Sequence, residues 1–508
     1  MRVTNSMISN ASQTHIANAK NKVMIGENQY TTQKKIQRPS DDPVVAVRAL
    51  KLRTAYAHVQ QFEKNVGDAI NWMGTAEKAL ESIDSIFTDM LGLLNQGAND
   101  DLDAKQRNSV LATLKKYAEG VFEDNANKDY SGRYMFTGYR TDTSLLFPEH
   151  TDNLQYKITQ NLNGNNINAI KVVSGGARYD DTKTAADYAK EVPKETNAYC
   201  MQLAYDNCVE PDTAAMPPVT FSLSITDKVG TAGTQNLTVV SLPSDDPNAY
   251  NIEEYNKTAN PQADAIFIYD KGEIVFSDAT YSRIQAQEAE ITVNYEKHEF
   301  DKGDIRPEMY FECQSYNVTS FKTTQYADPS GQEIRYEVDF SQTAVVNTQA
   351  KDAIGTDIYR IVDYIERMVT NANDVDDQIS EIDKKIANTE ETDPKLADYK
   401  KLKEMLETEQ NLYKGAMTQA FGMGITTIQK AQDDINVAIA DVGTRYDRLE
   451  MTSEKLMDDK VDTREKMSDN EDIDIADAYM NMTQAYDLYT AALSATSKIL
   501  GNSLLNYI

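Results

Sequence analysis

The sequence predicts an α+β protein in which both chain ends form a long antiparallel α-helical coiled coil or bundle, with a β-rich outer domain inserted in the middle. Three observations predict this fold. Apolar residues recur in steps of three and four over residues 52–94, the same rhythm returns over residues 475–500, and apolar positions alternate within residues 148–344. Steps of three and four place side chains on one face of a helix, whereas alternation is typical of strands.

The first forty residues carry a thin apolar stripe in which small or polar residues occupy several positions. Its members are Ile8, Ser12, Ile16, Ala19, Val23, Gly26 and Tyr30. A helix with so narrow a stripe buries little surface by itself, so its stability depends on partners.

The block Arg38-Pro39-Ser40-Asp41-Asp42-Pro43 interrupts this first helical pattern. A residue that precedes proline is pushed out of the helical region, whereas Asp can cap a helix and Pro suits its first position. We therefore expect a long helix that is capped by Asp42, begins at Pro43 and ends near Gly97, where glycine offers a left-handed stop. Its stripe over residues 52–94 is interpreted as intramolecular core that packs on residues 428–449. A second helix is expected over residues 103–127.

The middle of the chain changes character. Residues 130–147 predict a strand and a turn, and residues 148–344 predict a β-rich insert. Its best-supported element is a hairpin in which Ile266 and Ile268 precede the turn Asp270-Lys271-Gly272.

Helical periodicity returns at Ile358 and continues to the end of the chain. Residues 375–420 predict a helical hairpin, and the charged stretch over residues 458–472 predicts a hinge before the last helix. Side chains on the two terminal helices are candidates for contacts between subunits. The pattern fits burial in the core of one chain as well as contact between subunits for these side chains: Ile8, Ile16, Val23, Ile475, Tyr479, Met482, Tyr486, Tyr489, Leu493, Leu500 and Leu504.

Charge and composition argue against several classes of protein. The net charge of -29 disfavours binding to nucleic acid or anionic membranes. No apolar run is long enough to span a membrane, and the first 30 residues lack the apolar segment of a cleaved signal peptide. The sequence gives no histidine pair, Walker loop or nucleophile motif, so we expect no catalytic, cofactor or metal site and no enzymatic activity. Cys200, Cys208 and Cys313 are either plain thiols or, outside the cell, include a Cys200–Cys208 disulfide.

Short motifs at both ends resemble the bacterial flagellin superfamily and, within it, the hook–filament junction proteins. The motifs are Arg38-Pro39-Ser40-Asp41-Asp42-Pro43, Gln96-Gly97-Ala98-Asn99, Gly132-Arg133-Tyr134-Met135-Phe136-Thr137-Gly138, Val442-Gly443-Thr444-Arg445 and Leu504-Leu505-Asn506-Tyr507-Ile508. The first block is the most specific, because filament flagellins usually carry an Ala-Lys-Asp-Asp-Ala type of sequence there.

The resemblance implies an extracellular structural subunit of the flagellum that is exported through the flagellar type III apparatus. Its partners would be other copies in a ring, the hook-side junction protein, the flagellin filament and a cytoplasmic export chaperone on the C-terminal helix. The resemblance also implies three domains. They are a terminal helical domain (1–41 with 466–508), a helical bundle (42–147 with 346–465) and the outer domain (148–345).

Three other readings stay open at this point. A filament-forming flagellin would share the helical ends and the export route. A surface enzyme or adhesin could occupy the middle domain, although only His150 and His298 lie there. A cytoplasmic coiled-coil scaffold would also account for the stripes.

Overall fold

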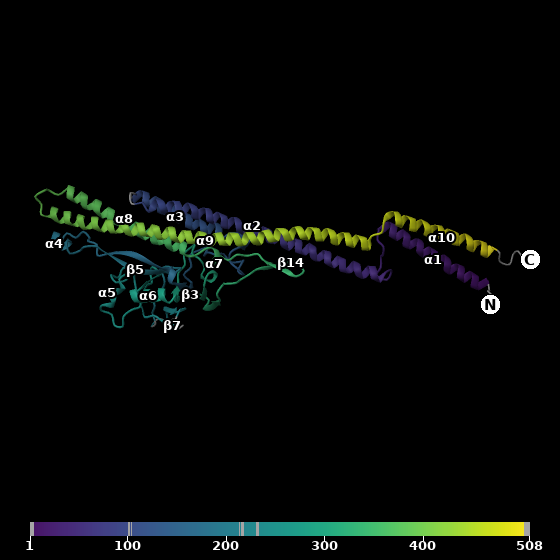
Figure 1. Ribbon diagram of the computed structural model, residues 1–508, viewed down its shortest axis with the longest axis horizontal. Helices are drawn as coiled ribbons and strands as arrows, with labels where there is room; N and C mark the ends of the chain where they lie inside the picture. Colours follow the sequence, from purple (N-terminus) through teal and green to yellow (C-terminus); the bar gives the residue numbers. More distant parts are fainter. Residues whose placement is uncertain are drawn as a thin grey trace, which may run out of the picture. The chain divides into compact units, whose positions relative to one another are not determined.

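The structure is a computed structural model that describes residues 5–501, except residues 100, 101, 103, 213, 215–217 and 230–232. For residues 5 and 499–501 it describes the backbone alone. The chain divides into two compact units (Figure 1). Unit 1 comprises residues 1–70, 335–344 and 447–508, and unit 2 comprises residues 71–334 and 345–446. The predicted division into three domains stays a prediction.

Five long helices dominate the described chain, as the stripes predict. They are α1 (Asn5–Thr32), α2 (Pro43–Gly97), α8 (Asp357–Ala387), α9 (Lys395–Glu471) and α10 (Ile475–Gly501). A shorter helix, α3 (Ala104–Glu119), continues into a π-helical turn over Gly120–Ala126. The α+β fold with helical ends is therefore confirmed.

The stripe on α2 is core, as predicted. Its residues from Val59 to Leu94 are buried, and most of the facing positions on α9 are buried as well: Ile428, Ile435, Val442 and Leu449. Polar contacts join the two helices within unit 2, because Gln432 donates to Asp84 at 2.8 Å. Burying large apolar side chains along such a seam contributes about 1.5–3 kcal/mol for each one.

The structure corrects the prediction that Gly97 ends α2 in a left-handed conformation. The φ angle of this glycine is not in the left-handed region, so it is not the left-handed stop that the sequence suggested. A Cβ atom at this position would instead lie 2.3 Å from Cε1 of Phe421 on α9. Glycine is needed there because the phenyl ring occupies the space of a side chain.

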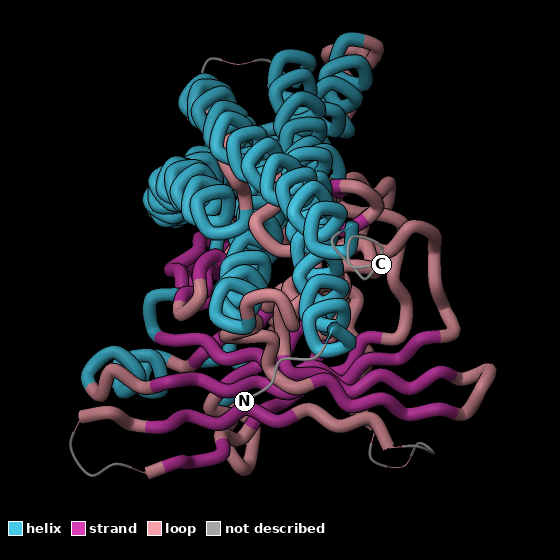
Figure 2. Tube along the Cα trace, turned by 90° about the vertical axis from the view of Figure 1, so that its right-hand side faces the viewer, coloured by secondary structure: helices cyan, strands magenta, loops and turns pink. Residues whose placement is uncertain are grey.

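The β-rich insert of unit 2 is a sandwich of two sheets (Figure 2). The strand order is β4-β5-β10-β9-β8 in one sheet and β13-β12-β3-β11-β6-β7 in the other. Both sheets contribute to one apolar core, in which the rings of Phe221 and Phe267 stack at 4.1 Å. The strands are β3 (Leu154–Asn163), β4 (Ile167–Ser174), β5 (Lys194–Gln202), β6 (Ser222–Thr226), β7 (Thr234–Asn236), β8 (Val239–Leu242), β9 (Ala265–Ile268), β10 (Glu273–Phe276), β11 (Glu290–Lys297), β12 (Glu312–Asn317) and β13 (Lys322–Tyr326).

Two further predictions for the insert are confirmed. Strands β9 and β10 form the antiparallel hairpin around Asp270-Lys271-Gly272, with Ile268 opposite Glu273. Gly272 has a φ of 57°, which favours glycine in such a turn. The strand and turn expected after residue 130 are the small hairpin of β1 (Asp129–Tyr130) and β2 (Arg133–Tyr134).

The helical hairpin expected over residues 375–420 is formed by α8 and the start of α9. Its arms share a small core with a segment of the β-rich insert, since Ala177 and Tyr188 are buried among Val375, Ile382 and Leu402. Arg178 donates two hydrogen bonds to Glu409 on α9, at 2.8 and 2.9 Å. The β-rich insert therefore supports the hairpin from within unit 2.

The hinge predicted over residues 458–472 is wrong in extent. Helix α9 continues to Glu471, and only residues 472–474 separate it from α10. The charged side chains stabilise helix here, because Lys466 pairs with Asp462 four residues earlier at 2.5 Å and Lys460 pairs with Glu63 on α2 at 2.6 Å.

Unit 1 also contains most of a two-stranded sheet of β14 (Arg335–Asp339) and β15 (Gln342–Val345), which form a hairpin. Its tip lies on α2, since the rings of Phe340 and Phe62 meet edge to face at 5.2 Å. Lys455 on α9 pairs with Asp339 at 2.7 Å. The hairpin therefore joins the two long helices of this unit.

Candidate assembly surface

The connection between α1 and α2 is built by the block Arg38-Pro39-Ser40-Asp41-Asp42-Pro43. Asp42 Oδ1 accepts hydrogen bonds from the backbone N–H groups of Val44 and Val45 at 2.9 and 3.2 Å, so it caps α2 as predicted. Asp41 Oδ2 accepts from the N–H groups of Gln37 and Arg38 at 3.2 and 2.9 Å. The two aspartates thereby fix the path of the chain into α2.

The same connection pairs with the break between α9 and α10. The N–H group of Lys35 donates to the carbonyl of Glu471 at 2.7 Å, and the N–H group of Ile473 donates to the carbonyl of Gln33 at 3.0 Å. These bonds place the end of α1 beside the start of α10. The two terminal helices consequently run antiparallel from these two paired connections, as Figure 1 shows. We call the paired connections α1–α2 and α9–α10 the elbow.

Charged side chains stabilise this elbow. Arg53 on α2 donates to Glu471 from Nε at 2.7 Å and from Nη2 at 2.5 Å, and Lys34 Nζ lies 3.5 Å from the same carboxylate. The hydrogen bond from Arg53 is the main cause that lowers the pKa of Glu471, while Lys34 lowers the pKa of Asp472 in the same way. The Glu471 side chain is only 5% exposed, so its charge depends on these partners.

Helices α1 and α10 pack through small residues. Ser12, Ala19 and Gly26 are buried on α1, and Ala478 is buried on α10. A Cβ atom at Gly26 would lie 3.0 Å from the Cα atom of Met482, so glycine lets the two backbones approach closely. A seam of such residues buries little apolar area.

The predicted interface residues fall into two groups in the structure. Five of them are half-buried along the seam: Ile8, Ile16, Val23, Met482 and Tyr489. Four on α10 are exposed and share one face of the helix, where the ring of Tyr479 also lies 5.9 Å from that of Tyr30 on α1: Ile475, Tyr479, Tyr486 and Leu493. We call these four residues the α10 stripe. The side chain of Leu500 and the whole of Leu504 lie outside the described residues.

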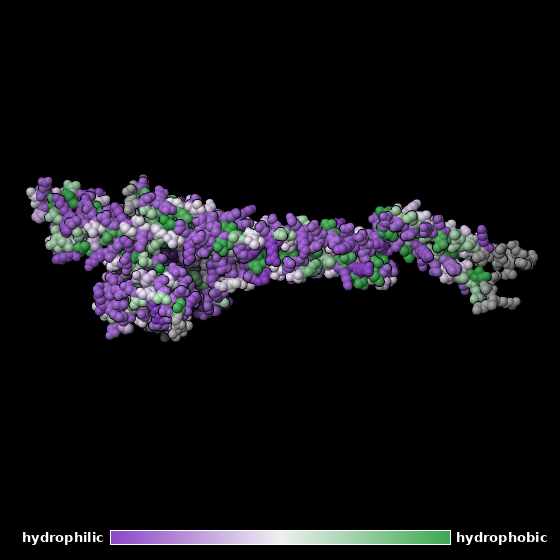
Figure 3. Space-filling model, viewed as in Figure 1, coloured by the Kyte–Doolittle hydropathy of each residue, from purple (hydrophilic) through white to green (hydrophobic). Residues whose placement is uncertain are grey.

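Sequence reasoning missed a second exposed apolar surface, at the start of α2. A shallow groove is lined there by Ile36, Pro39, Pro43, Val47 and Leu50. Val47 and Leu50 are exposed, and Leu50 is 68% exposed. The signal was present in the sequence, because Pro43, Val47, Leu50, Thr54 and Ala57 recur in steps of four and three. Green, hydrophobic surface is visible along this part of the chain and over the terminal helices (Figure 3).

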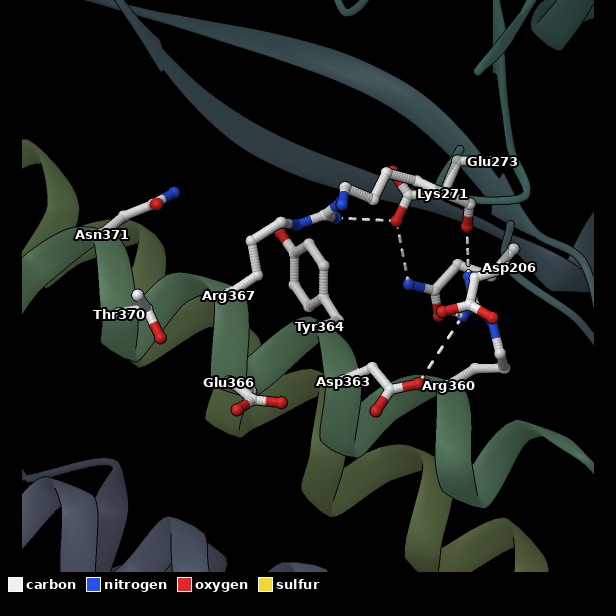
Figure 4. Close-up of a pocket in the computed structure, with 11 residues that line it drawn as sticks. Asp206, Lys271, Glu273, Arg360, Asp363, Tyr364, Glu366, Arg367, Thr370 and Asn371 are labelled. Carbon is white, nitrogen blue, oxygen red and sulfur yellow. Dashed lines mark hydrogen bonds and ion pairs between the residues drawn. The ribbon is translucent and has the colours of Figure 1, made fainter. Parts of the chain in front are cut away.

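A polar pocket in unit 2 is the other notable site (Figure 4). Arg367 on α8 pairs with the buried Glu273 of β10 at 2.7 Å, and Tyr250 donates to the same carboxylate at 2.6 Å. Arg360 donates to the carbonyl of Leu203 at 3.0 Å, and burial raises the pKa of its neighbour Asp363 to about 6. These charged groups pair with one another, so the pocket fastens α8 to the sandwich.

Neither a metal cluster nor a membrane helix is evident in the described part of the chain. No group of three or more His, Cys, Asp or Glu side chains there could hold a metal ion. No described helix is long and apolar enough to cross a membrane. All three cysteines are buried free thiols in the structure, and none forms the Cys200–Cys208 disulfide left open by the sequence.

Comparison with known families supports the resemblance of both chain ends. The bacterial flagellin N-terminal helical region matches residues 3–141, and the bacterial flagellin C-terminal helical region matches residues 425–508. These ranges contain α1, α2, α3, the second half of α9 and α10. Both helical ends of the chain are therefore similar to the helical regions of bacterial flagellins.

The chain is also similar to flagellar hook-associated protein 3. The protein of that name from Salmonella typhimurium is 25% identical over 144 residues, which are 28% of this chain and 45% of the relative. The one from Escherichia coli is 25% identical over 149 residues, which are 29% of this chain and 47% of the relative. The chain therefore spans about half the length of the curated relatives it matches.

The solved structures that match this chain include flagellar proteins. The flagellar junction protein FlgL from Legionella pneumophila has a TM-score of 0.26 and 13% identity, and the match covers 84% of this chain and all of that one. Xanthomonas campestris FlgL has a TM-score of 0.30 and 10% identity, and the match covers 82% of this chain and 99% of that one.

Proposed function

We propose that this protein is a structural subunit of the bacterial flagellum that forms the junction between hook and filament. The observation that carries the proposal is the α10 stripe, which a single chain leaves exposed beside a seam of small residues. An aligned row of large apolar side chains on a helix is typical of a surface that another protein covers. Neighbouring copies in a ring, together with hook-side and filament subunits, would cover it.

The arrangement of the terminal helices supports ring assembly. Helix α1 also exposes apolar residues outside the seam, such as Ile25, so the helix pair presents apolar surface on both of its members. Two different surfaces on one subunit allow a head-to-tail interface, which closes into a ring when the rotation between subunits permits. The half-buried residues Ile8, Ile16 and Val23 would then complete the contacts together with Met482 and Tyr489.

The proposed role includes an extracellular location that is reached through flagellar type III export. A helix pair with a thin seam opens easily, which suits a chain that must travel unfolded and then gain stability from its neighbours. A cytoplasmic chaperone would cover the C-terminal helix before export. In the assembled state, residues 1–41 with 466–508 would form the inner layer and residues 148–345 would face outward.

A filament-forming flagellin is the second candidate function. It is favoured by the two flagellin helical regions, which do not by themselves separate the two roles. The similarity to hook-associated protein 3 favours the junction. A purified filament flagellin should polymerise alone into long filaments, whereas a purified junction subunit should not.

The proposal is tested by locating the protein on detached flagella. An antibody against the outer domain should label one narrow band where the hook meets the filament, and deletion of the gene should release filaments from otherwise intact hooks. Label along the whole shaft would favour the filament role. Absence of the protein from flagella would exclude both.

A further inference from the structure

We propose that the groove at the start of α2 receives the α10 stripe of a second copy of this chain. This inference rests on the proposed function, because it names the partner of a surface that the flagellar role requires. Pro43, Val47 and Leu50 line the groove, and Thr54 and Ala57 continue their row along α2. We call these five residues the α2 stripe, and all five are exposed in the structure.

Both stripes have the spacing that helix packing needs. The α2 stripe advances in steps of four and three, and the α10 stripe advances in steps of four and seven. Each row therefore stays on one face of its helix. At 1.5 Å per residue the α2 stripe is about 21 Å long and the α10 stripe about 27 Å long. The two stripes can therefore lie along each other over the whole length of the α2 stripe.

The charges around the two stripes are complementary. The groove is lined by Lys34, Arg38 and Arg53, and Arg48 and Lys51 are exposed on the same turns of α2. Within the described residues, Arg38, Arg48 and Lys51 form no ion pair. Unpaired cations in one place are notable in a chain whose net charge is -29.

The α10 stripe lies in an acidic setting. From residue 474 to residue 497 the charged residues are Asp474, Asp477 and Asp487, and none is basic. An acidic, apolar helix approaching a basic, apolar groove gains both apolar burial and electrostatic steering. A copy of the same chain offers such a helix in every subunit, whereas α2 of a second copy would bring cations against cations.

Cysteine cross-linking tests the contact. One copy of the chain carries Leu50→Cys, a second copy carries Tyr486→Cys, and both are expressed in the same cells. Flagella are then isolated, oxidised and analysed on non-reducing gels. The natural cysteines are buried and should give no background. We expect a disulfide-linked dimer when both variants are present and none when either is present alone. Leu50→Cys combined with Val437→Cys is the matched control, since Val437 is 71% exposed on α9 but outside both stripes.

Each outcome decides between the two proposals. A mixed dimer with the Tyr486 variant and none with the Val437 variant supports the contact. Flagella that contain both variants without the mixed dimer overturn the contact and leave the proposed function intact. Absence of the unsubstituted protein from isolated flagella, measured in parallel, overturns the proposed function. As a second measurement, Lys51→Glu should lower the yield of the mixed dimer several-fold, and adding Asp487→Lys on the other chain should restore it; an unchanged yield would contradict charge pairing.

Discussion

Arg53 on α2 and Glu471 at the end of α9 form a two-point ion pair, with Nε–Oε1 at 2.7 Å and Nη2–Oε2 at 2.5 Å. The two residues are far apart in the sequence, and their pairing fixes the elbow from which both terminal helices leave. The direction of α1 and α10 therefore depends on one nearly buried carboxylate.

Replacing Glu471 with Gln should destabilise the protein by about 1–2 kcal/mol at pH 7, a modest cost because Arg53 is well exposed to solvent. The folded-state pKa of Glu471 lies below its ordinary value of 4.5. Its ion pair therefore stabilises the fold above about pH 4.5, and that contribution is lost as the pH falls through the folded pKa. Urea unfolding at several pH values should show the difference between the two proteins shrinking below pH 4.5. A difference that is constant from pH 3 to 7 would contradict this role.

Gly97→Ala should destabilise unit 2 by about 1–3 kcal/mol, because the new Cβ atom would overlap the ring of Phe421. Gly92→Ala on the same helix is the matched control, since no atom lies within 4 Å of its Cβ position. That control should gain up to about 1 kcal/mol from the better helix propensity of alanine. Thermal unfolding measures both changes, and a Gly97 variant as stable as the Gly92 variant would be inconsistent with the packing described.

Leu493→Asp should leave the purified protein as stable as the wild type to within about 0.5 kcal/mol, because Leu493 is exposed in the single chain. The same change should abolish incorporation into flagella, since assembly would bury an unpaired charge at a cost of several kcal/mol. Val437→Asp provides the control, with normal stability and normal incorporation expected. Motility and the protein content of isolated flagella give the readout, and normal incorporation of the Leu493 variant would count against the α10 stripe.

The three cysteines should be unreactive in the folded protein. Burial raises the pKa of Cys208 to about 12 and holds that of Cys200 well above its ordinary value, so neither forms thiolate near pH 8. A thiol reagent should react with three groups after unfolding in urea without reductant, and with almost none before. Reaction of a single group after unfolding would reveal a Cys200–Cys208 disulfide.

Much of this fold could be predicted from the sequence because large apolar side chains mark the deep seams. The cap at Asp42, the start of α2 at Pro43 and the hairpin at Gly272 follow from local chemistry that needs no distant partner. Tertiary packing decided the rest. The role of Gly97 depends on Phe421, a residue more than 300 positions away.

The terminal helices show why a hydropathy stripe can miss a seam. The pattern selects large residues such as Tyr479 and Tyr486, whereas the buried face of α10 includes Ala478. Close helix packing favours small side chains, which carry little weight in an apolar pattern. The exposed tyrosines and leucine then remain available for contact with another subunit, and a single chain does not contain that contact.

Hydrogen exchange of the purified protein tests the central claim most directly. If α1 and α10 depend on neighbouring subunits, their amides should exchange at least about 100-fold faster than those of α2 between residues 59 and 94, because a thin seam gives little protection. The same amides should become protected in isolated flagella. Equally slow exchange of the terminal helices and the α2 core in dilute, isolated protein would contradict the account.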